Sequence, residues 1–201
     1  MDTPAPFSSP GPSRGGRETI VEAVLRVLST GGADDLSVRK VAAEARVSVG
    51  AVQHHFPTRA ALIIGAMDAV TARFRERLGA ALATADSADE RLRTFCDELA
   101  ALGDAGRWDA IVWTAFASRA GTDPEVRALH VREWRRTEKA VHSLLVAAFP
   151  AAHITTDDAA LLLAALDGIA VARGAEGDAR MPPERGRALI ATLLATYAAR
   201  S

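Results

Sequence analysis

The 201-residue chain contains one cysteine, Cys96, which excludes an intramolecular disulfide framework and a metal site built from several thiolates. It also lacks an apolar run long enough to span a membrane, so the sequence predicts a soluble protein. Aromatic residues make up only 5% of the chain and runs of β-branched residues are scarce, whereas alanine dominates a hydrophobic fraction of 49%. This composition favours helices over sheets, and the length suits one or two helical domains.

The first sixteen residues are rich in proline, glycine and serine and contain no hydrophobic core. They do not form a signal peptide, and we predict that residues 1–16 are a disordered tail of a cytoplasmic protein. The formal net charge of −1 means that the chain as a whole does not hold nucleic acid by net positive charge. Between Arg14 and Arg59, seven basic residues outnumber five acidic ones. A contact with nucleic acid therefore depends on where these few charges lie.

Residues 36–62 have the pattern of two short capped helices joined by a tight turn. Ser37 is a good N-cap residue, and apolar residues recur at helical spacing from Val38 to Ala45. Ser48 is a second N-cap candidate, and the helix that it begins is closed by Pro57. Two such helices with a turn of three to four residues form a helix-turn-helix, whose second helix enters the major groove of DNA. The alternative is a small exposed helix in an ordinary bundle.

A helical wheel separates the second short helix into two faces. The face predicted to pack on the first helix contains Val52 and His55. The opposite face has small side chains at its start, where Gly50 lets the backbone approach a ligand closely. At its C-terminal end it carries two hydrogen-bonding side chains. Gln53 can pair with an adenine edge or a phosphate oxygen, and His54 can donate to a phosphate or a base acceptor.

This segment resembles the DNA-binding domain of TetR-family transcriptional regulators, whose pattern is Thr/Ser-x-x-x-Ile/Val-Ala, then Gly-Val-Ser-x-Gly-x-x-Tyr-x-His-Phe-x-x-Lys-x-x-Leu. Three positions depart from it. Arg46 replaces the turn glycine, at a cost of about 1 kcal/mol if that position is left-handed. Gln53 replaces the tyrosine, and Arg59 replaces the lysine but keeps its charge. The positions over which the pattern lies are Ser37, Val41, Ala42, Val47, Ser48, Gly50, His55, Phe56, Arg59 and Leu62.

The resemblance implies a three-helix DNA-binding domain over residues 17–62 and a ligand-binding and dimerisation domain over residues 63–201. The first helix of the DNA-binding domain is predicted to stop at Gly31-Gly32. The bound partner is expected to be a double-stranded DNA operator. The residues expected to contact it are Ser37, Arg39, Ser48, Val49, Gly50, Gln53, His54, His55, Thr58 and Arg59.

The rest of the chain reads as further helices without any strand pattern, so the fold class is predicted to be all-α with about nine helices. Arg73, Arg75 and Arg77 are predicted to form a solvated face of a long helix after Thr58. Residues 112–136, with Ala165–Ile169, resemble the C-terminal domain of the subgroup that includes choline/betaine-type repressors. In that family the last two helices of each subunit form a four-helix bundle, so the resemblance implies a homodimer through the last two helices.

The resemblance also implies an effector pocket between the body helices, with aromatic side chains as candidate walls. Each of these side chains is at least as well explained as a core residue when it is taken singly. A largely apolar or aromatic compound with a few polar anchors is the effector that such walls favour. The residues considered for ligand binding are Phe95, Cys96, Trp113, Phe116, His130, Trp134 and Asp167.

No metal site, cofactor or catalytic site is expected. His54 and His55 are adjacent on a helix, so their side chains point about 100° apart, and no third ligand lies nearby in the sequence. No nucleophile elbow, phosphate-cradling glycine loop or paired-carboxylate pattern is visible. Cys96 is expected to be a buried apolar cysteine, because a redox sensor needs an exposed thiol of lowered pKa.

These features together predict a ligand-responsive DNA-binding repressor. It would bind a palindromic operator as a dimer and be released by a small-molecule effector. The alternative is an all-helical small-molecule-binding protein or enzyme whose DNA-binding domain does not function.

Overall fold

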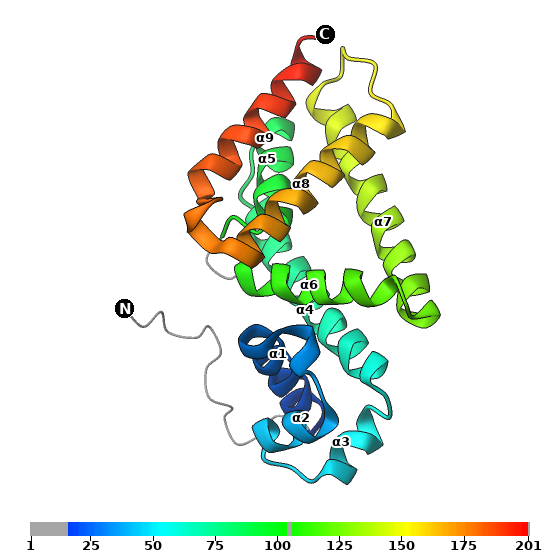
Figure 1. Cartoon of the computed structure of the whole chain (residues 1–201). Coiled ribbons are helices and arrows are strands. Elements are labelled where there is room, and N and C mark those ends of the chain that lie inside the picture. Colours follow the sequence, from blue (N-terminus) through cyan, green and yellow to red (C-terminus); the bar gives the residue numbers. More distant parts are fainter. Residues whose placement is uncertain (1–15, 104–105, 201) are drawn as a thin grey trace. The chain divides into compact units, whose positions relative to one another are not determined.

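The computed structural model describes residues 16–103 and 106–200. The predicted tail of residues 1–16 therefore lies outside the described residues except for Gly16, which is the first residue of a helix. Within those two ranges the chain forms nine α-helices, one short 3-10 helix and no strand, which confirms the predicted all-α fold (Figure 1). The chain divides into two compact units, Met1–Thr71 with Ile111–Arg127 (unit 1) and Ala72–Ala110 with Ala128–Ser201 (unit 2).

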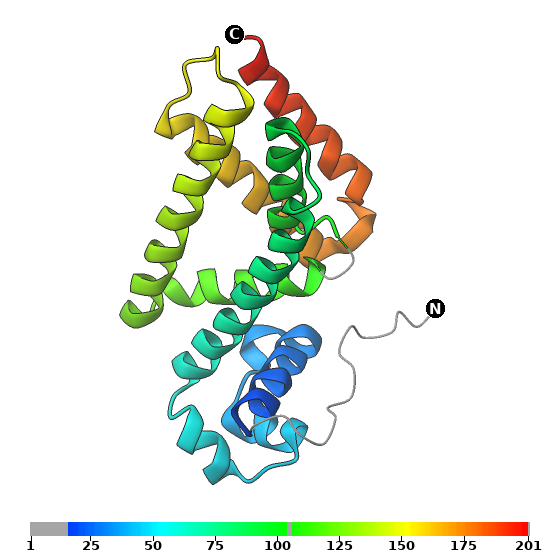
Figure 2. The same cartoon turned by 180° about the vertical axis from the view of Figure 1, so that it is seen from behind.

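Unit 1 contains α1 (Gly16–Asp35), α2 (Val38–Ala45), α3 (Val49–His55) and the first half of α4 (Arg59–Leu82). These helices are blue to cyan in Figures 1 and 2. Apolar side chains of α1 and α4 are shielded from water, and this burial stabilises the unit. The buried residues of these two helices include Ile20, Val24, Leu25, Leu28, Leu62, Ile63 and Ala66.

The sequence predicted that the first helix stops at Gly31-Gly32, and the regular helix does break there. It kinks at Gly32, whose φ of 70° is readily adopted only by glycine, and helical backbone continues to Asp35. The prediction located the break correctly but treated a kink as an end. One further helical turn is the difference.

Unit 2 contains α5 (Ala88–Leu99), α8 (Thr156–Glu176), the 3-10 helix η1 (Gly177–Ala179) and α9 (Pro183–Ala198). Its apolar core extends over α5, α8 and α9 and includes residues of α7 (Pro124–Ala148). In both views α8 lies beside α9 (Figures 1 and 2). The core residues that are at most 1% exposed are Leu92, Cys96, Ala100, Val141, Leu145, Ala159, Leu162, Leu166, Leu194 and Tyr197.

Two more helices, α6 (Gly106–Ala120) and α7 (Pro124–Ala148), have residues in both units, as α4 does. The start of α7 is capped by Asp123, whose Oδ1 accepts hydrogen bonds from the backbone N–H groups of Glu125 and Val126. None of the described helices combines the length and the apolar character that crossing a membrane requires.

The prediction of a solvated arginine face on α4 was wrong for Arg77. Its guanidinium donates from Nε to Glu98 Oε2 at 3.1 Å and from Nη2 to Asp109 Oδ2 at 2.6 Å. Burial raises the pKa of Asp109, and the nearby Arg77 opposes that rise. Arg77 thus ties α4 to α5 and to the first turn of α6 inside unit 2.

Candidate nucleic-acid interface and effector-binding residues

The segment from α2 to α3 has the geometry of a helix-turn-helix. The Ser37 hydroxyl caps α2 by accepting from the backbone N–H of Lys40 at 3.2 Å, and Ser48 caps α3 by accepting from that of Ala51 at 3.1 Å. Both predicted N-caps are therefore confirmed. Three residues separate the helices, and the first of them, Arg46, is left-handed with φ 56° and ψ 41°. The strain anticipated for an arginine at the turn position is thus present.

A small number of buried side chains fixes α3 in place. Val41 and Val52 are completely buried, and they anchor α2 and α3 from the inside of unit 1. Phe56, which follows α3 directly, is 3% exposed and packs against α4 at Gly65, where a Cβ atom would lie 2.5 Å from its ring. The backbone of α3 is therefore held at both ends before any partner binds, as a reading helix requires.

The outward surface of α3 carries the polar side chains that the sequence predicted there. Gln53 and His54 are exposed, and Val49 has 42% of its surface exposed. Gly50 presents bare backbone, with Ser48 Oγ at 3.8 Å as the nearest atom to a Cβ built there. Such a surface can enter a groove closely at its start and offer hydrogen-bonding groups to base edges further along.

His55 is exposed as well, contrary to the wheel that placed it on the packed face. Val52 is the buried residue of this seven-residue helix, and His55, at the C-terminal end of the face predicted to pack, is exposed to solvent. The rings of His54 and His55 lie edge to face with their centres 5.2 Å apart. No group of three or more potential metal ligands exists among the described residues.

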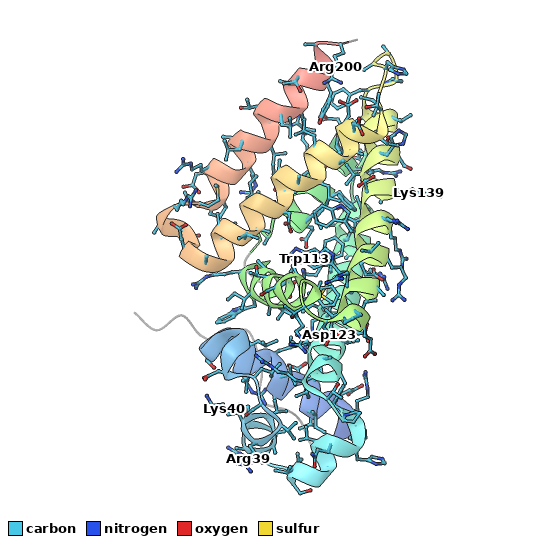
Figure 3. The ribbon with its side chains drawn as sticks, turned by 45° about the vertical axis from the view of Figure 1, so that its right-hand side comes forward. Arg39, Lys40, Trp113, Asp123, Lys139 and Arg200 are labelled. Atoms are coloured by element: carbon cyan, nitrogen blue, oxygen red, sulfur yellow. The ribbon has the colours of Figure 1, made fainter. Side chains whose placement is uncertain are left out.

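The basic side chains of unit 1 differ in whether they already contact other residues of the protein. Its described part contains eight arginines and lysines, and six of them contact other residues. The side chains of Arg39 and Arg46 are exposed and make no ion pair, hydrogen bond or ring contact with any described residue. Figure 3 shows Arg39 and its neighbour Lys40 projecting from α2; the Lys40 ammonium pairs with Asp35.

The predicted contacts at the start of α4 are placed by a third cap. Thr58 Oγ1 accepts from the backbone N–H of Ala61 at 3.0 Å, which leaves its neighbour Arg59 in the first turn of α4. Arg59 is exposed and already engages another residue of the protein. To bind a DNA phosphate, Arg59 would have to give up that contact, whereas Arg39 would not lose any.

Five of the predicted effector-binding residues belong to unit 2, namely Phe95, Cys96, His130, Trp134 and Asp167. The rings of His130 and Trp134 stack at 5.9 Å with an angle of 20° between their planes. Burial lowers the pKa of His130, and the negative charge of Asp167 partly opposes this effect. A flat aromatic pair and a carboxylate are therefore within electrostatic reach of one another.

Phe95 and Cys96, the other two predicted effector-binding residues of unit 2, are core residues. Phe95 is 5% exposed and meets Phe74 edge-on at 6.3 Å. Cys96 is completely buried, and burial raises the pKa of its thiol to about 12. The expectation that Cys96 is a buried apolar cysteine is thereby confirmed.

Trp113 and Phe116 belong to unit 1, and their rings pack on each other at 5.7 Å. Phe116 is completely buried, whereas Trp113 is only half-buried. The two neighbours on α6 therefore differ in how much of their surface a ligand could still cover.

Two sequence families match the chain. Residues 20–66 match the bacterial regulatory proteins of the tetR family, and residues 88–199, more than half of the chain, match the C-terminal domain of BetI-type transcriptional repressors. The chain belongs to the TetR family of transcriptional regulators. It is accordingly a ligand-responsive DNA-binding repressor of the BetI subgroup.

Solved structures of other regulators share this fold. A transcriptional regulator from Rhodococcus sp. Rha1 is 29% identical, with 90% of this chain and 95% of that one covered and a TM-score of 0.79. A transcriptional regulator from Pseudomonas aeruginosa PAO1 is 28% identical, with 91% and 90% covered and a TM-score of 0.74. A regulator from Saccharomonospora viridis in complex with choline is 19% identical, with 89% and 95% covered and a TM-score of 0.78, which shows the fold alone. No curated protein sequence matches the chain.

The list of DNA contacts predicted from the sequence of this TetR-family regulator omitted Arg46. Two features of the sequence draw attention to this residue, namely its departure from the family's turn glycine and its place beside the proposed DNA face.

Proposed function

We propose that two copies of this TetR-family regulator bind one near-palindromic operator, with the two α3 helices in successive major grooves. The observation that carries this proposal is the outward surface of α3, where Gln53 and His54 are exposed on a helix fixed from behind by Val52 and Phe56. Because operator DNA is the partner, the protein is placed in the cytoplasm. Small-molecule binding would favour a conformation with lower affinity for the operator.

The proposed dimer interface consists of the last two helices. Exposed apolar residues follow one stripe of α8 at spacings of three and four, namely Leu161 (54% exposed), Ala164, Gly168 and Val171 (38% exposed). Leu189 on α9 is 45% exposed. Burying such residues against a second copy removes apolar surface from water, and Gly168 allows close approach of the helices.

The DNA-binding part of the proposal is tested by selection of bound sites. The full chain is incubated with a random duplex library, and the bound DNA is amplified and sequenced. Two-fold symmetric half-sites with centres about one helical turn apart, or slightly more, are expected. Recovery of unrelated sequences, with no preference over the starting library, would contradict the proposal.

The dimer is tested by charge insertion at two exposed apolar positions. Leu161→Glu on α8 should produce a monomer in light scattering and abolish binding to the selected duplex. Val146→Glu, a change at a 45% exposed residue of α7, is the matched control and should remain dimeric. An intact dimer in Leu161→Glu would place the interface elsewhere.

The candidate effector residues remain proposals, and Trp113 and Phe116 allow them to be separated from plain core. Trp113→Ala should weaken release from DNA by an effector found in a thermal-shift screen, while operator affinity without effector stays unchanged. Phe116→Ala removes a completely buried ring and should cost about 3–5 kcal/mol of unfolding free energy. If Trp113→Ala lowers the melting temperature as much as Phe116→Ala does, Trp113 is a core residue.

A further inference from the structure

Arg46 has a backbone conformation that an arginine disfavours. Its φ of 56° and ψ of 41° are left-handed, and Arg46 and Ala101 are the two non-glycine residues with positive φ in the described chain. For an L-residue with a Cβ atom this conformation costs roughly 1–2 kcal/mol, whereas glycine adopts it without that cost. The sequence nevertheless has a long charged side chain here.

No described residue compensates for that cost by contacting the side chain. The Arg46 guanidinium is exposed and has no ion pair, hydrogen bond or ring contact with any described residue. Its backbone N–H donates to Ala43 O at 3.2 Å, a contact that glycine at this position would make equally well. Within the described part of the chain, the side chain therefore makes no contact that would explain its presence.

Ala101, in unit 2, shows how a left-handed residue is held when the protein itself supports it. Ala101 is 4% exposed, and its carbonyl accepts a 2.6 Å hydrogen bond from Nε of the buried Arg173. Tertiary contacts on several sides thus fix this turn. The contrast with Arg46 indicates that the partner of the Arg46 side chain lies outside the chain.

The position of Arg46 indicates what that partner is. Arg46 lies two residues before Ser48, the N-cap of α3. In a helix-turn-helix complex, the N-terminal residues of the helix in the position of α3 contact base edges in the major groove. Phosphates line both edges of the groove at that point, and arginine forms strong charge-assisted hydrogen bonds with phosphate. A turn residue with a long, free guanidinium is well placed to reach one of them.

We propose that the Arg46 side chain binds a DNA phosphate at the edge of the groove that α3 enters, and thereby holds the start of α3 against the operator. This inference rests on the proposed operator binding. Arg46 is a positioning residue in this account, because a phosphate contact carries no sequence information directly.

The experiment measures the salt dependence of binding for four full-length proteins. Wild type, Arg46→Gly, Arg46→Lys and Ala101→Gly are titrated onto the duplex selected by the wild type, with fluorescence anisotropy at 50 to 200 mM salt. Thermal unfolding is recorded in parallel. Arg46→Gly relieves the strain and removes the charge, Arg46→Lys keeps both, and Ala101→Gly relieves strain at a site without a proposed DNA contact.

Arg46→Gly should melt about 2–4 °C higher than wild type and yet bind DNA more weakly. The slope of log affinity against log salt should fall by about one per subunit, which makes the loss of affinity between 50 and 200 mM salt roughly tenfold smaller for a dimer. Arg46→Lys should restore the slope, and Ala101→Gly should leave it unchanged.

An unchanged slope in Arg46→Gly would overturn the assignment of Arg46, even if wild type binds its operator well. Equal loss of slope in Ala101→Gly would show that the change reflects altered folding, which also overturns it. If wild type selects no duplex at all, operator binding itself fails, and that result is distinct from a normal operator complex with a solvent-exposed Arg46.

Discussion

The α2–α3 motif of unit 1 and the junction around Arg173 in unit 2 use polar side chains in opposite ways. Arg173 is 5% exposed and donates to Ala101 O and Met181 O, both at 2.6 Å, and to Asp178 Oδ1 at 3.1 Å. The side chains of Gln53 and Arg39 are exposed, and neither makes a hydrogen bond or an ion pair with a described residue. The junction uses its polar groups for its own stability, whereas the fold leaves those of the motif unused, and we propose that DNA binds them.

This comparison predicts that substitutions in the two regions separate stability from DNA binding. Removing a side chain that the fold has satisfied leaves buried groups without partners and destabilises the protein. Removing one that the fold has left free changes little until DNA is present. The following experiments are ordered from the largest expected effect to the smallest.

Arg173→Ala should have the largest effect, because it leaves the carbonyl groups of Ala101 and Met181 without their hydrogen bonds inside unit 2. The expected loss of unfolding free energy is about 3 kcal/mol in denaturant titrations. Arg180→Ala, whose side chain is 61% exposed and pairs with Glu176, is the control and should cost less than about 1 kcal/mol. Equal effects of the two substitutions would remove the contrast between a buried and a solvated arginine.

Arg77→Ala should have an intermediate, pH-dependent effect. It leaves the side chains of Glu98 and Asp109, which are 24% and 19% exposed, without their cation, at an expected cost of about 1–2 kcal/mol near pH 7. Burial already raises the pKa of Asp109, and losing Arg77 raises it further. The destabilisation should therefore be full above the raised folded-state pKa of Asp109 and disappear as the pH falls below the unfolded-state pKa, where the carboxyl is protonated in both states.

The double substitution Arg77→Ala/Asp109→Asn is the control for that pH dependence. It removes the buried carboxylate together with its partner, so its stability should vary less between pH 4 and pH 7 than that of Arg77→Ala. If the single substitution is equally destabilising at both pH values, the loss comes from packing of the arginine stem and not from the charge.

Gln53→Ala tests the motif side of the comparison. The amide should contribute about 1–3 kcal/mol of discrimination at one base pair of each half-site, and its loss should not change the melting temperature. A binding-site selection with the variant should return a motif relaxed at that base pair. An identical motif would assign Gln53 to a phosphate contact.

Cys96 gives the smallest expected effect. Because burial raises the pKa of its thiol to about 12, the native protein should not react with a thiol-specific reagent at pH 8, whereas the denatured protein should react fully. The sign for stability follows from the raised pKa. Stability contributed by the protonated thiol is present below the unfolded-state pKa and is lost as the pH rises towards 12, and Cys96→Ala should remove that loss.

How much could be predicted from the sequence depends on how far apart the contacting residues are. Ser37, Ser48 and Asp123 cap helices within three residues, so their roles follow from local spacing, and the all-α fold follows from helical periodicity. Arg173 bonds to a carbonyl 72 residues away, and Arg77 to carboxylates 21 and 32 residues away. No local pattern specifies these partners, which is why Arg77 was assigned to a solvated face.

The candidate sites show the same division. The surface of α3 was predicted residue by residue because a short helix repeats every 3.6 residues, although His55 at its end was assigned to the wrong face. The effector residues come from four different helices, and the sequence offered only residue types for them. One clue in the sequence went unused, since Arg173 is the single basic residue of the apolar helix α8.

The most direct test of α3 as the DNA-reading helix compares how strongly two multiply substituted variants prefer the selected duplex over unrelated DNA. Gln53→Ala/His54→Ala removes two side chains of α3. Arg135→Ala/Arg136→Ala/Lys139→Ala removes three exposed cations of α7, of which Figure 3 labels Lys139. We expect the first variant to lose roughly tenfold or more of its preference for the selected duplex over unrelated DNA, and the second to bind as wild type does. Wild-type preference in the α3 variant, or a larger loss in the α7 variant, would contradict the assignment of α3 as the DNA-reading helix.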